Sequence, residues 1–270
     1  MMINYVCKLA YVGTAYKGWQ IQAPGIETVE HTIEQTLYSI FGVPIRVGVC
    51  SRTDAGVHAL GQIGSFQAPG SITLYRLFRG LNALLNDDIS ILDLVRTEHL
   101  VNVRKENRGK RYIYHIHNGP VDFAFSRTTS WCVYEPLNLE VMRRVARHLV
   151  GSFDFSAFQG KGCNALSTFK TITKIEIQQR SHRFGGDQIK IIVEGQSFLK
   201  NMVRIIVGAL VDIGRGKLNE NAVQIALKSG KRSDIGITAP PHGLFLDEVF
   251  FDKDLFENGI LAIINSRSKS

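Results

Sequence analysis

The stretch VCSRTDAGVHALGQIGSF, from Val49 to Phe66, consists of two apolar, strand-like runs joined by a polar turn. The turn carries one carboxylate, Asp54, with Arg52 two residues before it and His58 four residues after it. An aspartate before Ala-Gly is also common turn chemistry, so Asp54 has two interpretations here, a catalytic acid or a turn former. The stretch predicts a strand, a tight turn and a second strand.

Outward from this stretch, the first half of the chain alternates between strands and helices. Apolar residues at every second position predict strands, and apolar residues three to four positions apart predict helices. The expected strands are 3–11, 43–49, 59–66 and 89–96, and the expected helices are 28–41 and 74–85. Gly42 is expected to end the first helix.

The same layout recurs in the second half, with expected strands 111–117, 168–179 and 187–197 and helices 138–150, 198–213 and one from Asn219. The pattern predicts an α/β (α+β) fold of two ferredoxin-like halves, 1–105 and 106–250, which share one mixed, mainly antiparallel sheet. Residues 251–270 lie outside the pattern and form a C-terminal extension, whose apolar middle is expected to be helical.

Composition favours a soluble globular protein. The chain has 270 residues, of which 44% are hydrophobic, so a sizeable core is expected. The longest apolar segment, 198–213, contains Lys200, Arg204 and Asp212, and this excludes a comfortable membrane span. The N-terminus lacks a basic leader and a cleavage site, so we expect a cytoplasmic protein.

Neither a disulfide framework nor a metal site is expected. The four cysteines are Cys7, Cys50, Cys132 and Cys163, and none forms a Cys-x-x-Cys pair. His115 and His117 share one face of an expected strand, but the sequence offers no third ligand beside them. The thiols are interpreted as free, and no metal is predicted.

Excess positive charge points to a polyanionic partner. The net charge is +8 and the pI is about 9.4, which favours nucleic acid without proving it. The cations cluster in VRKENRGKRY, which contains Arg104, Lys105, Arg108, Lys110 and Arg111. This basic segment has two open interpretations, an RNA-backbone site or a solvated connector.

Seven motifs occur in order between about residue 3 and about residue 250. They are YVGTAYKGWQIQ, SRTDAGVHALGQ, LNALLNDDI, KRYIYHI, GSFDFSAF, FLKNMVRIIVG and TAPPHGLFL. Together they resemble the bacterial tRNA pseudouridine synthase A family. The chain departs from the family's usual residues at Ser51, in the segment VNVR that ends at Arg104, and at Lys200 and Asn201.

The resemblance implies the pseudouridine synthase fold and the isomerisation of uridine to pseudouridine in the anticodon arm of tRNA, at positions thirty-eight, thirty-nine and forty. It also implies a homodimer that needs neither cofactor nor metal. Asp54 falls on the family's catalytic aspartate, Arg204 on its salt-bridge partner and Arg52 on the arginine that displaces the target base. Tyr112 falls on the tyrosine that stacks on the uracil, and Leu244 is expected to close the other side.

One carboxylate is enough for this reaction, because the bond from C1′ to N1 is replaced by one from C1′ to C5 with no hydrolysis or oxidation. Asp54 could attack the sugar, attack the uracil or remove a sugar proton, and the sequence leaves these routes open. A glycoside hydrolase would use two carboxylates. Two other functions stay open: an RNA-binding protein without chemistry, and a pseudouridine synthase for another RNA.

Overall fold

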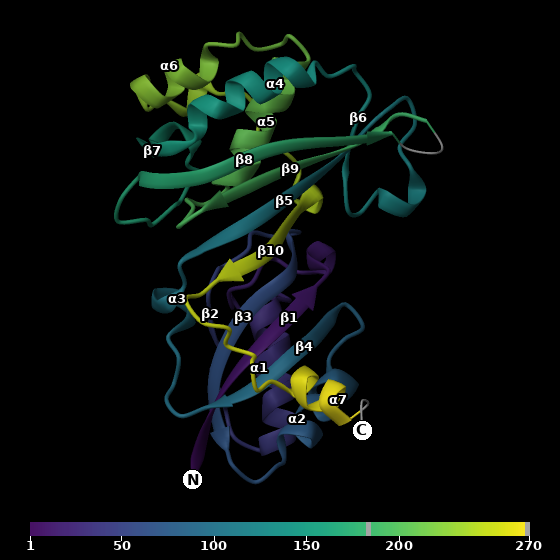
Figure 1. Ribbon diagram of the computed structural model, residues 1–270, viewed down its shortest axis with the longest axis vertical. Coiled ribbons are helices and arrows are strands. Elements are labelled where there is room, and N and C mark those ends of the chain that lie inside the picture. Colours follow the sequence, from purple (N-terminus) through teal and green to yellow (C-terminus); the bar gives the residue numbers. More distant parts are fainter. Residues whose placement is uncertain (182–184, 268–270) are drawn as a thin grey trace. The chain divides into compact units, whose positions relative to one another are not determined.

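A computed structural model describes residues 1–181 and 185–267. The chain forms two compact units (Figure 1). The first comprises Met1–Arg108 together with Leu246–Ser270, and the second comprises Gly109–Phe245. Each unit is a mainly antiparallel sheet with helices, which confirms the predicted α/β class.

In the first unit, β1 is the central strand. The elements are β1 (Met2–Tyr11), α1 (Val29–Phe41), β2 (Gly48–Val49), β3 (His58–Pro69), α2 (Leu74–Leu84), β4 (Ile89–Thr97) and α3 (Val103–Glu106). Strand β1 pairs antiparallel with both β3 and β4, and Cys7 lies opposite Gly64 on one side and Leu94 on the other. Thr28 caps α1, and Gly42 ends it with a φ of 70°, which confirms the prediction for Gly42.

The last part of the chain also belongs to the first unit. Strand β10 (Leu244–Phe250) leads into it from the second unit, and it runs so close to β3 that a Cβ on Gly61 would lie 2.4 Å from the carbonyl oxygen of Asp247. Helix α7 (Ile260–Arg267) contacts β4, where the Leu261 amide donates to Asp93 Oδ1 at 3.2 Å. The expected C-terminal extension thus packs with the first unit, and α7 agrees with the helix expected in its apolar middle.

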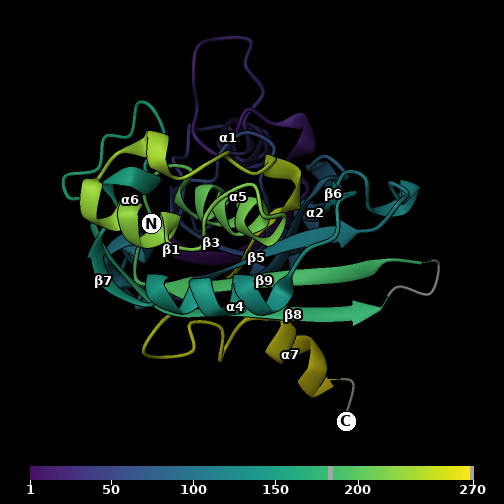
Figure 2. The ribbon, with the colours of Figure 1, turned by 90° about the horizontal axis from the view of Figure 1, so that it is seen from above.

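The second unit contains β5 (Gly109–Asn118), β6 (Trp131–Val133), α4 (Leu139–Ala146), β7 (Gly151–Asp154), β8 (Phe169–Ser181), β9 (Asp187–Gly195), α5 (Met202–Gly214) and α6 (Ala222–Ser229). Its strands are ordered β5-β9-β8-β7, and short β6 runs parallel to β5. Figure 2 shows α4 alongside β8. Helix α5 is buried on nearly all sides, as expected for the central helix of a core.

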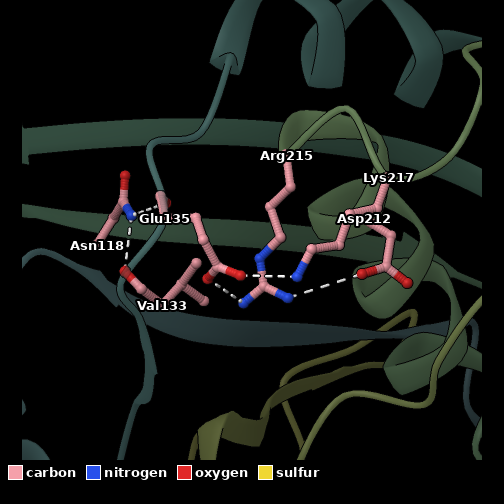
Figure 3. Close-up of polar contacts among 6 residues, drawn as sticks. All are labelled: Asn118, Val133, Glu135, Asp212, Arg215 and Lys217. Carbon is pink, nitrogen blue, oxygen red and sulfur yellow. Dashed lines mark hydrogen bonds and ion pairs between the residues drawn. The ribbon is translucent and has the colours of Figure 1, made fainter.

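A charged cluster fixes the C-terminal end of α5 (Figure 3). The Arg215 guanidinium lies 5.3 Å from the centre of the Trp131 ring, and its nitrogens lie 3.2 Å from Glu135 and 3.7 Å from Asp212. Lys217 Nζ also reaches Glu135, at 2.7 Å. The cluster ties α5 to the segment after β6, and α5 carries Arg204 near its other end.

Two expected segments differ from the structure. Of residues 43–49, only Gly48 and Val49 form a strand. The Glu34 carboxylate of α1 accepts the Val47 amide at 3.0 Å, so this amide bonds a side chain instead of a neighbouring strand. The expected connector at 104–111 is instead helix α3 followed by the start of β5. Within the described residues, no helix is long and apolar enough to cross a membrane.

Candidate active site

Asp54 lies in the loop between β2 and β3, where buried and open side chains alternate. Arg52 is exposed, Thr53 is buried and Asp54 is half-buried. The Thr53 hydroxyl makes a 2.8 Å hydrogen bond with the hydroxyl of Tyr11 on β1. Thr53 is thus held toward the core, while Arg52 beside it is exposed. The predicted turn around Asp54 is thus confirmed, while the chemistry of Asp54 stays a prediction.

Hydrogen bonds hold both ends of this loop. At its start, Gln62 Nε2 donates to the Ser51 carbonyl at 2.6 Å, and Gln62 Oε1 accepts the Ser51 amide at 3.3 Å. At its end, the Val57 amide donates to the Asp54 carbonyl at 3.1 Å, across Gly56 with a φ of 76°. Asp54 therefore both closes a turn and presents a carboxylate, so the two interpretations do not exclude each other.

The first motif, YVGTAYKGWQIQ, packs directly on the Asp54 loop. The Trp19 amide donates to the Thr53 carbonyl at 3.1 Å, and a Cβ on Gly18, whose φ is 95°, would lie 2.8 Å from that same oxygen. His58 Nδ1 accepts the Gly13 amide at 3.1 Å. His58 thus bonds the backbone of the first motif, 45 residues earlier in the chain, and Trp19 is a core residue.

Two tyrosines beneath the loop stay neutral near pH 7. Burial raises the pKa of Tyr11 to about 12, although its hydrogen bond with Thr53 opposes the shift. Burial also raises the pKa of Tyr16 to about 12, assisted by the hydrogen bond that its hydroxyl donates to Asp88 at 2.6 Å. Both phenols therefore stay protonated and act here as hydrogen-bonding groups.

The other predicted site residues, Tyr112, Arg204 and Leu244, belong to the second unit. Tyr112 on β5 is buried, and its ring meets the Phe198 ring edge-on at 5.3 Å between centroids. Leu244 begins β10 and is buried. Arg204, in the first turn of α5, donates from Nε to the Ala239 carbonyl at 2.8 Å.

The groups around Arg204 leave its charge in place. The Tyr114 hydroxyl donates to the Pro240 carbonyl at 2.8 Å, and burial raises the pKa of Tyr114 well above its ordinary value, against the effect of the Arg204 charge. Burial lowers the pKa of His242, and the Arg204 charge adds to that shift. Tyr114 and His242 are therefore neutral near pH 7.

Residues 145–252 match the family model described as tRNA pseudouridine synthase. The chain is 41% identical over 243 residues to tRNA pseudouridine synthase A of Geotalea uraniireducens, covering 90% of this chain and 97% of that protein. It is 39% identical over 243 residues to that of Myxococcus xanthus, covering 90% of each chain.

The chain belongs to the tRNA pseudouridine synthase A family. The alignments with these two relatives cover 90% of the chain. Both units are therefore part of the family's architecture. The family is one of isomerases, which agrees with a loop whose only carboxylate side chain is that of Asp54.

In this tRNA pseudouridine synthase A family member, the basic segment is less uniform than its sequence suggests. Arg104 and Lys105 are exposed on α3. Arg108 is paired with Asp252, with Nε 2.7 Å from Oδ2, and Arg111 with Glu194 at 2.8 Å. Lys110 is buried in β5. The burial of Lys110 and the ion pairs of Arg108 and Arg111 distinguish these three from the exposed Arg104 and Lys105, and binding of the RNA backbone by the segment stays a prediction.

Sequence reasoning missed several supporting residues of this family member. Tyr11 and Gln62 lie beneath the Asp54 loop and hold it through Thr53 and Ser51. Lys17 is an exposed cation in the loop that packs on Asp54's own loop. The glycines on either side of Lys17 in the first motif could have predicted that this loop packs on another backbone, because glycines often occur where two backbones approach closely.

Proposed function

We propose that the chain converts uridine to pseudouridine in the anticodon arm of tRNA, at positions thirty-eight, thirty-nine and forty. The observation that carries the proposal is the likeness to proteins named tRNA pseudouridine synthase A across 90% of the chain, with the Asp54 loop inside the matched length. It works as a homodimer in the cytoplasm, where its substrate is found, and it uses neither a cofactor nor a metal.

Asp54 is the catalytic group of this proposal. Its carboxylate starts the cleavage of the bond from C1′ to N1, by attack on the sugar, attack on the uracil or removal of a sugar proton. The uracil then turns and bonds to C1′ through C5, and the proton on C5 moves to N1. A half-buried site protects the intermediate from water, and a nearby cation keeps the carboxylate ionised despite its burial.

The other site residues bind and orient the RNA. Arg204 supplies the positive charge that balances Asp54, and Arg52 takes the place of the extruded nucleotide in the stem. Extrusion is needed because the sugar and base are blocked inside a helical stack. Tyr112 stacks on the uracil and Leu244 closes its other side. Arg104 and Lys105, both exposed, bind phosphates.

The decisive experiment maps pseudouridine in unmodified tRNA after incubation with the purified protein, by carbodiimide modification and primer extension. We expect new stops in the anticodon arm with the wild type and none with Asp54→Asn. Stops in another arm, or only in ribosomal RNA, would favour a synthase for a different RNA. Tight tRNA binding without any stop would favour an RNA-binding protein without chemistry.

A further inference from the structure

Asn201, immediately before α5, has an unusual backbone. Its φ is 60° and its ψ is 3°, a left-handed conformation. In the part of the chain that the structure describes, it is the only residue other than glycine with a positive φ. Such a conformation is unfavourable for residues with a Cβ, and it often occurs where a site requires it.

The side chain of Asn201 does not do what its position predicts. An asparagine at a helix N-cap ordinarily accepts a hydrogen bond from an amide of the first turn. Asn138 does so before α4, where it accepts the Val141 amide at 3.2 Å. Asn201 makes no such bond before α5, and its Oδ1 instead accepts Nη1 of Arg204 at 3.0 Å. The left-handed backbone thus coincides with a side chain directed to the guanidinium.

Gly160 leaves room for this amide. A Cβ on Gly160 would lie 2.5 Å from Nδ2 of Asn201 and 3.1 Å from its Cγ. The Gly160 amide donates to the carbonyl of Lys200 at 2.8 Å, which fixes the backbone just before Asn201. The side chain of Asn201 therefore packs against a backbone that leaves it little freedom to turn away from Arg204.

Arg204 is held on two sides. Its Nε donates to the Ala239 carbonyl at 2.8 Å, its carbonyl accepts the Ala239 amide at 3.0 Å, and its Nη1 donates to Asn201. These side-chain bonds use two of the five N–H donors of a guanidinium. Because the group is planar and rigid, two bonds to different nitrogens fix the plane and the direction of the remaining donors.

We propose that Asn201 is a positioning residue: with a left-handed backbone and a side chain that does not cap α5, it holds the Arg204 guanidinium in the single orientation that the proposed reaction uses. It acts through Arg204 and touches no RNA. This inference rests on the proposed function, because it takes Arg204 as the cation that serves Asp54.

Asn201→Gly tests the proposal, since glycine accepts the left-handed backbone and removes only the side-chain oxygen. We expect the melting temperature to stay within about 3 °C of the wild type. The kcat at saturating tRNA should fall about tenfold or more, because small misplacements of a catalytic constellation have effects of that size. The KM for tRNA should change less than about twofold.

Two variants control for a purely structural role. Asn201→Asp keeps an oxygen acceptor of the same size in a residue that tolerates this backbone, and we expect most of the kcat to return. Asn138→Gly removes the capping asparagine before α4, and we expect a slightly lower melting temperature with wild-type kcat. If Asn201→Gly loses stability in proportion to activity, or keeps the wild-type kcat, the proposal is overturned.

A double-mutant cycle separates this inference from the function on which it rests. Asn201→Gly should add little to the loss of kcat caused by Arg204→Ala, because both variants remove the same interaction between Asn201 and Arg204. Full additivity would contradict a role through Arg204. If Arg204→Ala itself keeps wild-type kcat, the assignment of Arg204 fails. If the wild type forms no pseudouridine in tRNA, the proposed function fails.

Discussion

At the scale of the residue, Asp54 has two tasks that one substitution separates. Its backbone carbonyl closes the turn with the Val57 amide, and its side chain supplies the proposed chemistry. Asp54→Asn keeps the size of the side chain and the backbone bond. We expect tRNA affinity and melting temperature to change little while pseudouridine formation disappears, measured on the same preparation. Measurable turnover by Asp54→Asn would refute the assignment.

The proposed stacking role of Tyr112 is best tested with substitutions that keep the side chain large, because Tyr112 is buried. It is 6% exposed, so Tyr112→Ala would open a cavity and destabilise the unit by about 3–5 kcal/mol. Tyr112→Phe keeps the ring. If the ring acts by stacking, this variant should keep most of the kcat, and Tyr112→Leu, with similar burial but no aromatic face, should lose most of it at near-normal tRNA Kd. Equal activity of the Phe and Leu variants would rule stacking out.

Glu135 in the charged cluster gives a prediction about pH. The hydrogen bond from Lys217 is the main cause that holds the pKa of Glu135 below its ordinary value. A lowered folded-state pKa stabilises the protein above the unfolded-state pKa, and this stabilisation is lost as the pH falls through the folded-state value.

Melting temperatures of the wild type and Glu135→Gln should therefore differ most near neutral pH and converge in acid, below the ordinary pKa of a glutamate. Glu257→Gln, at an exposed glutamate, is a control for the general effect of acid on this protein. A difference between wild type and Glu135→Gln that stays constant down to pH 3 would contradict the ion pair.

At the scale of the element, α3 carries the two exposed cations of the basic segment. Each phosphate contact contributes about 0.9 to the slope of log K against log salt on a duplex. Changing both Arg104 and Lys105 to Gln should lower that slope by up to about 2 and weaken tRNA binding, while kcat at saturation changes little.

The matched control removes two charges elsewhere, with Arg147→Gln and Lys228→Gln. Both side chains are exposed in the second unit, on the turn after α4 and on α6. An equal loss of slope in both double variants would mean that net charge, and no particular contact, drives binding. An unchanged slope in the α3 variant would leave α3 as a solvated helix.

Elements were largely predictable from the sequence because periodicity and caps are local signals. The expected helices at 28–41 and 74–85 match α1 and α2 to within a residue. The prediction of a strand at 43–49 is wrong because the Val47 amide donates to the carboxylate of Glu34, which lies outside the local pattern. Local patterns contain no information about such distant partners.

The candidate site was predictable as a set of residues but not as a set of contacts. Lys110 lies two residues before Tyr112 on the same strand, so both side chains are on one face of the sheet. The alternation of faces along a strand could therefore have predicted that Lys110 is buried. The ion pair of Arg111 with Glu194 depends on the register of β5 with β9, which the sequence does not give. Gln62 ends the motif SRTDAGVHALGQ, but periodicity alone does not show that its side chain bonds the Ser51 backbone.

At the scale of the whole molecule, α7 is a stabilising element of the first unit. Ile260 is buried, and the carboxylate of Asp93 on β4 would lose the Leu261 amide if α7 were removed. Deleting residues 259–270 should lower the melting temperature by several degrees, with kcat preserved at a temperature where the shortened protein is folded. A large loss of kcat there would give the C-terminal residues a role in the reaction.

The first unit is discontinuous in the chain, and this has a consequence for synthesis on the ribosome. The chain leaves the unit after Arg108 and returns at Leu246, and the Arg108 amide donates to the Phe250 carbonyl at 2.7 Å. The second unit, Gly109–Phe245, is continuous, so the nascent chain can finish it first. The sheet that bears the Asp54 loop is complete only after β10 has been made, so a chain stalled before Leu246 contains every proposed site residue but has a β3 edge that lacks β10.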